Sequence, residues 1–277
     1  MNLSRLRLGA FVLAFGLFAA ACGGDDDTAT DESSSSASAS ASSSASESAS
    51  ASGSSSASEP ASLEPIIVEH KFGETEVPRD PQRVVSLGVS DQDDLLALGI
   101  VPVGILDWYG DQPFAVWPWA QDLLGDAEPL VIPSAEPSPE LIAGLDPDLI
   151  VAVSSGLTQE QYDLLSQVAP TVASPAGYED WSAPWQVRTA MIGEIFDRSG
   201  ETDAMIAQVE DRFEQIRAEN PAFDGATAAV AFTFNNQPGA YTSTDVRAQI
   251  MGSLGFVTPA EYDELALNGF YVSFSEE

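Results

Sequence analysis

The side chains best placed for chemistry in this chain are aromatic, and two of them directly follow a predicted strand. Trp108 and Tyr109 come after the apolar run at residues 103–105 and stand among glycine and polar residues. A bulky apolar side chain in such a loop is not simply continuing the core, and its ring offers a surface on which a small ligand can stack. We therefore expect both residues to bind a ligand. The alternative is that both rings pack under the loop that runs to Trp119.

Groups that catalyse reactions or hold metal ions are scarce in the sequence. His70 is the only histidine, Cys22 is the only cysteine, and there is neither a G-x-S-x-G motif nor a phosphate-binding glycine loop. A zinc or manganese site needs more imidazole or thiolate ligands than this, and a catalytic site needs a base or nucleophile with a partner. We expect a protein that is not an enzyme, with no catalytic residues, metal site or cofactor of its own, and a packed or edge histidine.

The elements that must position the aromatic rings are short strands alternating with helices. A hairpin with Gly73 in its turn region and Pro78 at its end comes first. Capping residues then start helices at Ser90, at Ser138 and at Thr158, where Gln161 completes a capping box. Strands are predicted at 84–87, 103–105, 148–153 and 171–173, with helices at 91–98, 140–145 and 159–168 between them. This alternation predicts a small doubly wound parallel sheet.

A long amphipathic helix is predicted at 201–219, between Ser199-Gly200, which should end the preceding helix, and Asn220-Pro221. Its apolar positions follow one helical stripe: Met205, Ile206, Val209, Phe213 and Ile216. Such a helix is roughly 28 Å long at about 1.5 Å per residue, enough to join two lobes. An ordinary surface helix within one domain is the alternative.

The α/β pattern restarts after this helix, with strands predicted at 226–234 and 241–242 and a helix at 245–256. The predicted fold class is therefore α/β, with two Rossmann-like lobes joined by a single long helix. The predicted domains are an N-terminal lobe at 63–200, a linking helix at 201–220 and a partial C-terminal lobe at 221–277.

Ligands of open α/β sheets bind outside the carboxyl ends of the strands, so the candidate residues are those in the loops that follow each strand. The candidates in the first lobe are Trp108, Tyr109, Ser155, Tyr178, Trp181 and Trp185, and those in the second are Asn235, Asn236 and Arg247.

The N-terminal residues 1–22 are arranged as a secretory signal, with Arg5 and Arg7, an apolar run and small residues before Cys22. The run is too short to span a bilayer. Residues 23–62 consist almost wholly of serine, alanine and acidic residues, which predicts a disordered tether. A plain signal peptide, cleaved near Ala21, would leave Cys22 as a free thiol.

The net charge of the chain is −33, and from Leu63 onward 36 acidic residues face 8 basic ones. A surface of this kind does not bind nucleic acid or other polyanions. A solvated surface adapted to salt explains the same composition without reference to any ligand.

Residues 66–277 resemble the substrate-binding proteins of ABC importers for ferric siderophores, haem and cobalamin, whose two lobes are linked by a rigid helix. The resemblance rests on HKFGETEVPRDPQRVVSLG, DLLALGIVPVGI, ELIAGLDPDLIV and LSQVAPTV, which occur in the family's order, and on DWYGDQPFAVWPWAQD, which is typical of ferric-siderophore members. The residues before Cys22 resemble a lipobox, although Ala19 replaces the usual leucine. This resemblance implies lipidation of Cys22 and a location on the extracytoplasmic face of the cell membrane.

The resemblance implies a monomer that captures a ferric siderophore and delivers it to a membrane permease, with iron present only within the bound complex. It also implies that Glu140 and Glu277 contact the permease. Only 57 residues follow Asn220, so we expect a truncated second lobe. A catecholate complex carries several negative charges and few arginines lie near the candidate loops, so we expect a hydroxamate siderophore. The alternatives are a cobalamin- or haem-binding protein of the same fold and a surface or adhesive lipoprotein without a transport role.

Overall fold

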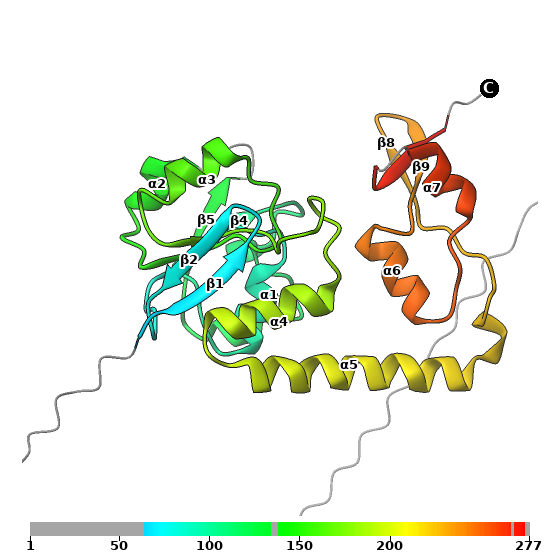
Figure 1. Cartoon of the computed structure of the whole chain (residues 1–277), viewed down its shortest axis with the longest axis horizontal. Coiled ribbons are helices and arrows are strands. Elements are labelled where there is room, and N and C mark those ends of the chain that lie inside the picture. The colour runs from blue at the N-terminus through cyan, green and yellow to red at the C-terminus, as the bar shows by residue number, and fades with distance from the viewer. Residues whose placement is uncertain (1–63, 134–137, 267–268, 275–277) are drawn as a thin grey trace, which may run out of the picture. The chain divides into compact units, whose positions relative to one another are not determined.

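The computed structural model describes residues 64–133, 138–266 and 269–274, which all lie in one compact unit, Ser58–Glu277. The fold is mixed α/β, as predicted, with a parallel sheet before the long helix α5 (Ser199–Glu219) and an antiparallel sheet after it (Figure 1). Within the described ranges, no helix combines the length and the apolar character needed to cross a membrane. Cys22, the predicted tether and Glu277 lie outside the described residues.

Five short parallel strands form the main sheet, in the order β5-β4-β3-β6-β7. Their bounds are β3 (Val84–Ser86), β4 (Gly104–Asp107), β5 (Leu130–Pro133), β6 (Leu149–Val151) and β7 (Thr171–Val172). The chain runs outward from β3 to β5 and then returns to the other side of β3 with β6. Because the connections after β3 and β6 diverge, a crevice is expected at the carboxyl ends of these two strands.

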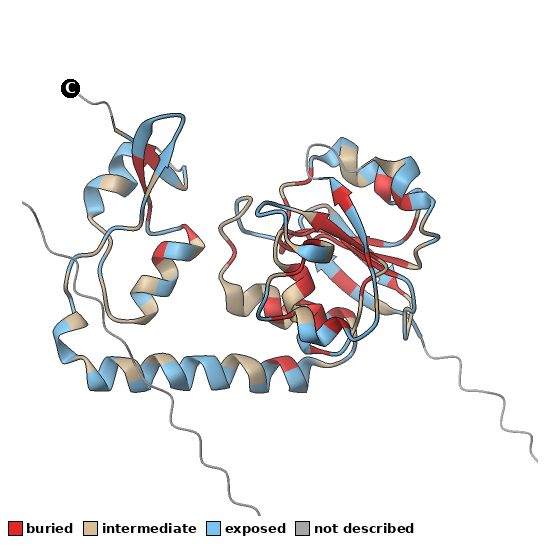
Figure 2. Cartoon of the chain, turned by 180° about the vertical axis from the view of Figure 1, so that it is seen from behind, coloured by how far each residue is buried: buried red, intermediate tan, exposed pale blue. Residues whose placement is uncertain are grey.

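Helices cover both faces of this sheet, which is the predicted doubly wound arrangement. Alternate strand residues serve the two faces, because successive side chains of a strand point to opposite sides. Val84 and Leu149 pack with α1 (Asp91–Ala97) and α4 (Trp185–Ile195), whereas Val85 and Ile150 pack with α2 (Pro139–Ala143) and α3 (Gln159–Leu165). Figure 2 shows the buried residues of these strands in red. Each fully buried leucine or isoleucine stabilises the fold by roughly 1.5–3 kcal/mol.

The predicted hairpin is present as β1 (Ile66–His70) and β2 (Gly73–Val77). His70 is buried, its Nε2 lies 2.9 Å from Thr75 Oγ1, and burial lowers its pKa. Thr75 Oγ1 donates in turn to the carbonyl oxygen of Thr171, at 2.7 Å, which ties the hairpin to β7. His70 is therefore a packed residue of the fold, as predicted.

All three predicted helix starts are present, but one lacks its side-chain capping bond. Thr158 and Gln161 form the expected capping box at α3, and Ser138 Oγ accepts a hydrogen bond from the Leu141 amide at α2. Ser90 precedes α1 but makes no side-chain capping bond, because its hydroxyl contacts Ser154 and Arg188 instead.

The junction between α4 and α5 also differs from the prediction. Helix α4 ends at Ile195, and Asp197 takes the left-handed backbone conformation with φ of 56°, so the chain turns before Ser199 rather than at Ser199-Gly200. Helix α5 then begins at Ser199. The two helices approach closely at Gly193, where an added Cβ atom would lie only 2.0 Å from Thr202 Oγ1. The absence of a side chain at Gly193 permits this approach.

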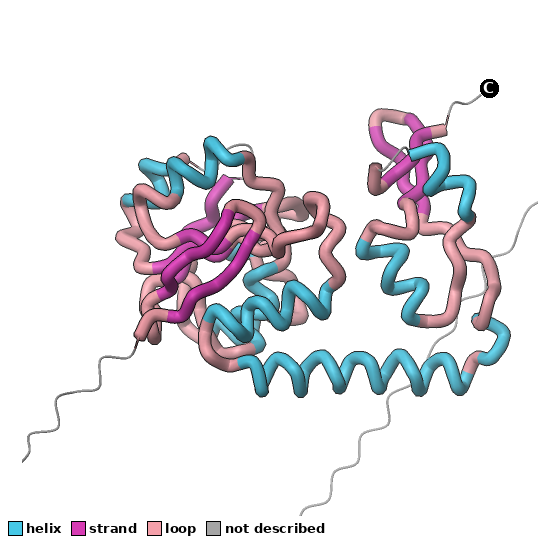
Figure 3. Tube along the Cα trace, viewed as in Figure 1, coloured by secondary structure: helices cyan, strands magenta, loops and turns pink. Residues whose placement is uncertain are grey.

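Beyond α5, a three-stranded antiparallel sheet has the order β10-β9-β8 (Figure 3). The elements of this part are η3 (Pro221–Phe223), β8 (Ala231–Phe234), β9 (Gln237–Tyr241), α6 (Val246–Ser253), α7 (Ala260–Ala266) and β10 (Tyr271–Ser273). The strand predicted at 226–234 forms only in its second half, and the one predicted at 241–242 overlaps the longer β9, which ends at Tyr241. Asn235 and Asn236, both with positive φ, make the two-residue turn that pairs β8 with β9.

Candidate functional site

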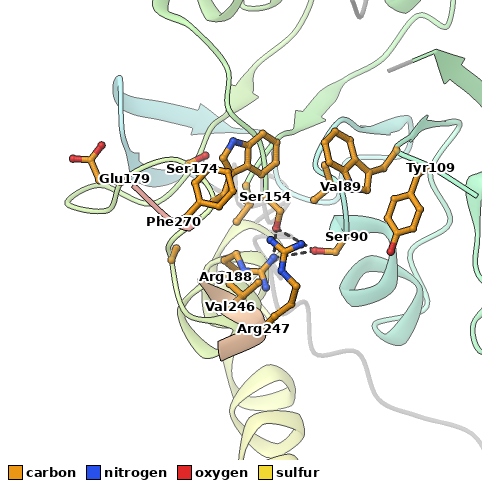
Figure 4. Close-up of a pocket in the computed structure, with 14 residues that line it drawn as sticks. Val89, Ser90, Tyr109, Ser154, Ser174, Glu179, Arg188, Val246, Arg247 and Phe270 are labelled. Atoms are coloured by element: carbon orange, nitrogen blue, oxygen red, sulfur yellow. Dashed lines mark hydrogen bonds between the residues drawn. The ribbon is translucent and has the colours of Figure 1, made fainter. Parts of the chain in front are cut away.

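A cavity of about 390 Å³ opens at the carboxyl ends of the parallel strands, where open α/β sheets bind ligands. Four of the five strands contribute through the residues that follow them. These are Val89 and Ser90 after β3, Trp108 and Tyr109 after β4, Val153 and Ser154 after β6, and Ser174 after β7. Further lining comes from α4 and the segment before it, and from Val246, Arg247 and Phe270, which follow α5 in the chain (Figure 4).

Arg188, in the first part of α4, directs its guanidinium at two serines that line the cavity (Figure 4). Its Nη1 donates to Ser90 Oγ at 2.9 Å and to Ser154 Oγ at 2.8 Å. A guanidinium carries five N–H donors in a fixed plane, so Arg188 can also donate to oxygen atoms of a ligand.

A buried carboxyl group stands behind these serines. Asp91 is fully buried, and its two oxygens accept hydrogen bonds from the amides of Val153, at 2.8 Å, and Ser154, at 2.9 Å. Burial raises the pKa of Asp91, while the Ser154 hydroxyl and the charge of Arg188 act to lower it. A Cβ atom on Gly88 would lie 2.0 Å from this carboxyl, so only glycine fits there. Asp91 thus fixes the loop after β6 and holds Ser154 beside Arg188.

Arg247 lines the cavity from the beginning of α6 and is itself paired. Its Nε and Nη2 donate to the two oxygens of the buried Asp245, at 2.7 and 2.6 Å, and its Nη1 donates to the Tyr241 hydroxyl at 2.9 Å. The hydrogen bond to Asp245 raises the pKa of Arg247. This bidentate pair leaves little net charge at that wall of the cavity.

Aromatic rings form another wall. The rings of Trp108 and Trp181 are stacked, with centroids 5.8 Å apart and planes inclined by 24°, and Tyr109 meets Trp108 edge-on at 6.4 Å. Trp181 has a φ of 69°, a conformation that a bulky residue adopts only when its surroundings hold it. Its indole lies against Gly156, where a Cβ atom would come within 2.8 Å of the ring. The wall is therefore positioned before any ligand arrives.

A family model described as periplasmic binding protein matches residues 84–271, which is most of the chain. The chain belongs to this family. The matched segment contains the parallel sheet, α5 and every residue named above as lining the cavity.

Several curated and solved relatives are similar to this periplasmic binding protein over most of its length. A probable siderophore-binding lipoprotein of Bacillus subtilis is 30% identical over 212 residues, which cover 75% of this chain and 62% of the relative. A periplasmic solute-binding protein from Mycobacterium smegmatis is 38% identical, with a TM-score of 0.65 and coverage of 70% and 69%. PiaA of Streptococcus pneumoniae, solved with ferrichrome, is 27% identical, with a TM-score of 0.65 and coverage of 76% and 73%. The chain thus spans about three fifths of the length of that curated relative.

The structure brings together four of the nine predicted ligand-binding residues: Trp108, Tyr109, Trp181 and Arg247 all line the cavity. The other five do not line it. The Ser155 hydroxyl is buried and donates to the carbonyl oxygen of Ala152 at 2.6 Å, which fixes the loop beside Ser154. Tyr178 is 39% exposed outside the cavity, Trp185 begins α4, and Asn235 and Asn236 form the turn of the β8-β9 hairpin.

Several lining residues were not among the predicted site residues. Ser90 and Ser154 lie in loops that follow strands, so their positions were predictable, but their pairing with Arg188 was not. Glu179 and Phe270 also line the cavity, and Phe270 comes from a part of the chain with no strand-end signal before it. In the described ranges, no group of three or more histidine, cysteine, aspartate or glutamate side chains is arranged to hold a metal ion.

The predicted permease contact Glu140 lies in the first turn of α2, away from the cavity lining. Ser138 Oγ donates to Glu140 Oε2 at 2.7 Å, and this hydrogen bond lowers the pKa of the carboxyl group. The carboxylate is thereby held ionised at the surface.

Proposed function

We propose that this protein captures a ferric siderophore in the cavity at the carboxyl ends of its parallel strands, as the binding component of an ABC importer. The observation that carries the proposal is the lining, in which stacked aromatic rings and two arginines share one cavity. Rings can pack on the organic shell of a chelate, and arginine N–H groups can bind its oxygen atoms. Similarity to a probable siderophore-binding lipoprotein and to a protein solved with ferrichrome gives independent support.

The charges around the cavity favour a siderophore without a high negative charge, such as a ferric hydroxamate. Arg247 is paired with Asp245, and Arg188 faces the charge of the buried Asp91. Glu179, which also lines the cavity, adds a further carboxylate. A triply anionic catecholate complex would lose its hydration in the cavity without enough unpaired positive charge to replace it. A neutral or cationic complex does not need that positive charge.

The proposed cellular setting follows from the sequence. A lipid on Cys22 would hold a monomer at the extracytoplasmic face of the cell membrane, and residues 23–62 would act as a flexible tether. The loaded protein would then deliver its cargo to a permease, with Glu140 at the contact.

Titration of tryptophan fluorescence tests the proposed cargo, because Trp108 and Trp181 line the cavity. Ferric hydroxamates should quench the signal at lower concentration than ferric catecholates, haem or cobalamin. Saturable quenching by haem or cobalamin, with none by any ferric siderophore, would replace the proposal with the corresponding alternative. No response to any of the four classes would favour a surface lipoprotein without a transport role.

A further inference from the structure

We propose that the captured chelate projects a flat, uncharged aromatic arm out of the cavity, along a row of rings formed by Trp108, Tyr109 and Trp119, which are exposed, and Trp117, which is half-buried. We call this row the aromatic strip. The inference rests on the proposed function, because it concerns a second part of the same ligand.

The rings of the aromatic strip are in unbroken succession from the cavity outward. Tyr109, which lines the cavity beside Trp108, meets Trp117 edge-on with centroids 5.3 Å apart. Trp117 then stacks on Trp119 at 5.1 Å with planes inclined by only 5°. The apolar surface of the cavity therefore continues beyond its rim in one direction.

The outer end of the strip is fixed in place although it is exposed. A Cβ atom on Gly110, whose φ is 97°, would lie 3.1 Å from Trp117, so this indole rests on the backbone of Gly110. Trp119 Nε1 donates to Asp93 Oδ2 at 3.1 Å, yet 69% of Trp119 is exposed. An indole held by a stacked neighbour and a hydrogen bond loses little further freedom when a second ring packs on it. Simple packing under the loop does not account for a tryptophan left so exposed.

Size and charge indicate what the strip accepts. A cavity of about 390 Å³ lies near the lower end of the roughly 300–1,000 Å³ range of small-molecule sites, so part of a large chelate must lie outside it. Residues 106–126, which carry the strip, include Asp107, Asp111, Asp122 and Asp126 but no lysine or arginine. An anionic arm would be repelled, whereas a planar neutral group can stack on the indole of Trp119.

The test uses the full chain and two neutral trihydroxamate complexes that differ only in the arm. The probes are the iron(III) complexes of N-acetyl and N-(2-naphthoyl) desferrioxamine B, with affinities measured by calorimetry. The naphthoyl complex should bind the unchanged protein about fivefold more tightly, the size expected for one aromatic contact. In Trp119→Ala this advantage should fall to about onefold while the affinity for the acetyl complex is kept. Trp119→Phe should retain part of the advantage, and Phe234→Ala, equally exposed but distant in the chain, should retain all of it.

Equal binding of the two complexes by the unchanged protein would overturn the proposal while leaving the proposed function intact. So would an advantage that survives in Trp119→Ala. The parent complex, whose arm is a primary ammonium, separates stacking from cation binding: if it gained most from Trp119, the occupant would be a cation and the proposed neutral arm would be wrong. If neither neutral complex bound, capture of hydroxamates would fail and the strip would fail with it.

Discussion

Arg188 and Arg247 reach the same cavity, but their surroundings make them unequal. Three N–H donors of Arg247 bind Asp245 and the Tyr241 hydroxyl. Its guanidinium also lies 3.6 Å from the centroid of the Tyr241 ring. Arg188 donates to two neutral serine hydroxyls, and the buried Asp91 acts on it only through its charge. A ligand oxygen would therefore draw more on Arg188, whereas the pair at Arg247 mainly shapes the opposite wall.

Replacing Trp108 with alanine should weaken cargo binding by about 1–3 kcal/mol and leave the melting temperature nearly unchanged. Trp108 lines the cavity and is 51% exposed, so its removal takes little from the core. Calorimetric titration and thermal unfolding of the same preparation measure the two effects. Tyr109→Ala should behave in the same way, with 63% of the residue exposed. Losses of stability as large as the losses of binding energy would show that these rings belong to the core.

The stability of the fold should depend on pH through Asp94, which accepts a hydrogen bond from Thr189 at 2.9 Å. Burial raises the pKa of Asp94 from 3.8 to about 6, with smaller contributions from the charges of Asp91 and Asp93. Between these values the folded protein retains a proton that the unfolded chain has lost, so the stability that this proton confers is complete below pH 4 and is lost as the pH rises through 6.

Asp94→Asn should therefore match the unchanged protein near pH 4 and exceed its free energy of unfolding by up to about 3 kcal/mol above pH 7. The asparagine keeps an oxygen that can accept from Thr189. Urea unfolding at a series of pH values measures the difference between the two proteins. A difference that stayed constant from pH 4 to 8 would contradict a raised pKa at this position.

At the scale of elements, the sequence predicts the strand and helix pattern well because that pattern is local. The capping box at Thr158 and the helix start at Ser138 are encoded within four residues. Prediction from local sequence fails at Ser90. This residue makes no side-chain capping bond, because its hydroxyl accepts a hydrogen bond from Arg188, 98 positions away. The hairpin turn at Asn235 and Asn236 was predictable from its two asparagines, but these were interpreted as a ligand-binding loop.

The contact between α4 and α5 should be sensitive to a single methyl group. Gly193→Ala would place a Cβ atom 2.0 Å from Thr202 Oγ1, so the two helices must separate, at a cost of about 1–3 kcal/mol. Gly200→Ala is the matched control, because its Cβ atom meets nothing within 4 Å and should stabilise α5 slightly. Denaturant unfolding measures both changes.

Combining Gly193→Ala with Thr202→Ala should recover part of the loss, because the second change removes the atom that collides. If the two losses simply added, the close approach of Gly193 to Thr202 would not be what limits the packing of these helices.

For the whole molecule, the dominant feature is negative charge. From Leu63 onward, 36 acidic residues outnumber 8 basic ones and produce a field that repels anionic complexes and attracts basic surfaces. Such a field acts on the rate and orientation of encounter more than on final affinity, and salt screens it. We therefore expect the charges that line the cavity to govern which cargo binds, and the acidic outer surface to govern docking.

Glu140 allows docking to be separated from cargo capture. Its carboxylate lies in the first turn of α2, is held by Ser138 and does not line the cavity. Glu140→Arg should abolish uptake by cells that carry the variant, because it replaces an acid at the proposed permease contact with a base, while cargo affinity of the purified protein stays the same. Glu76→Arg makes an equal change of charge at an exposed position of β2 and should leave uptake unaffected. Uptake at the normal rate with Glu140→Arg would exclude Glu140 from the contact, whereas loss of uptake with both variants would point to the overall charge instead of one docking residue.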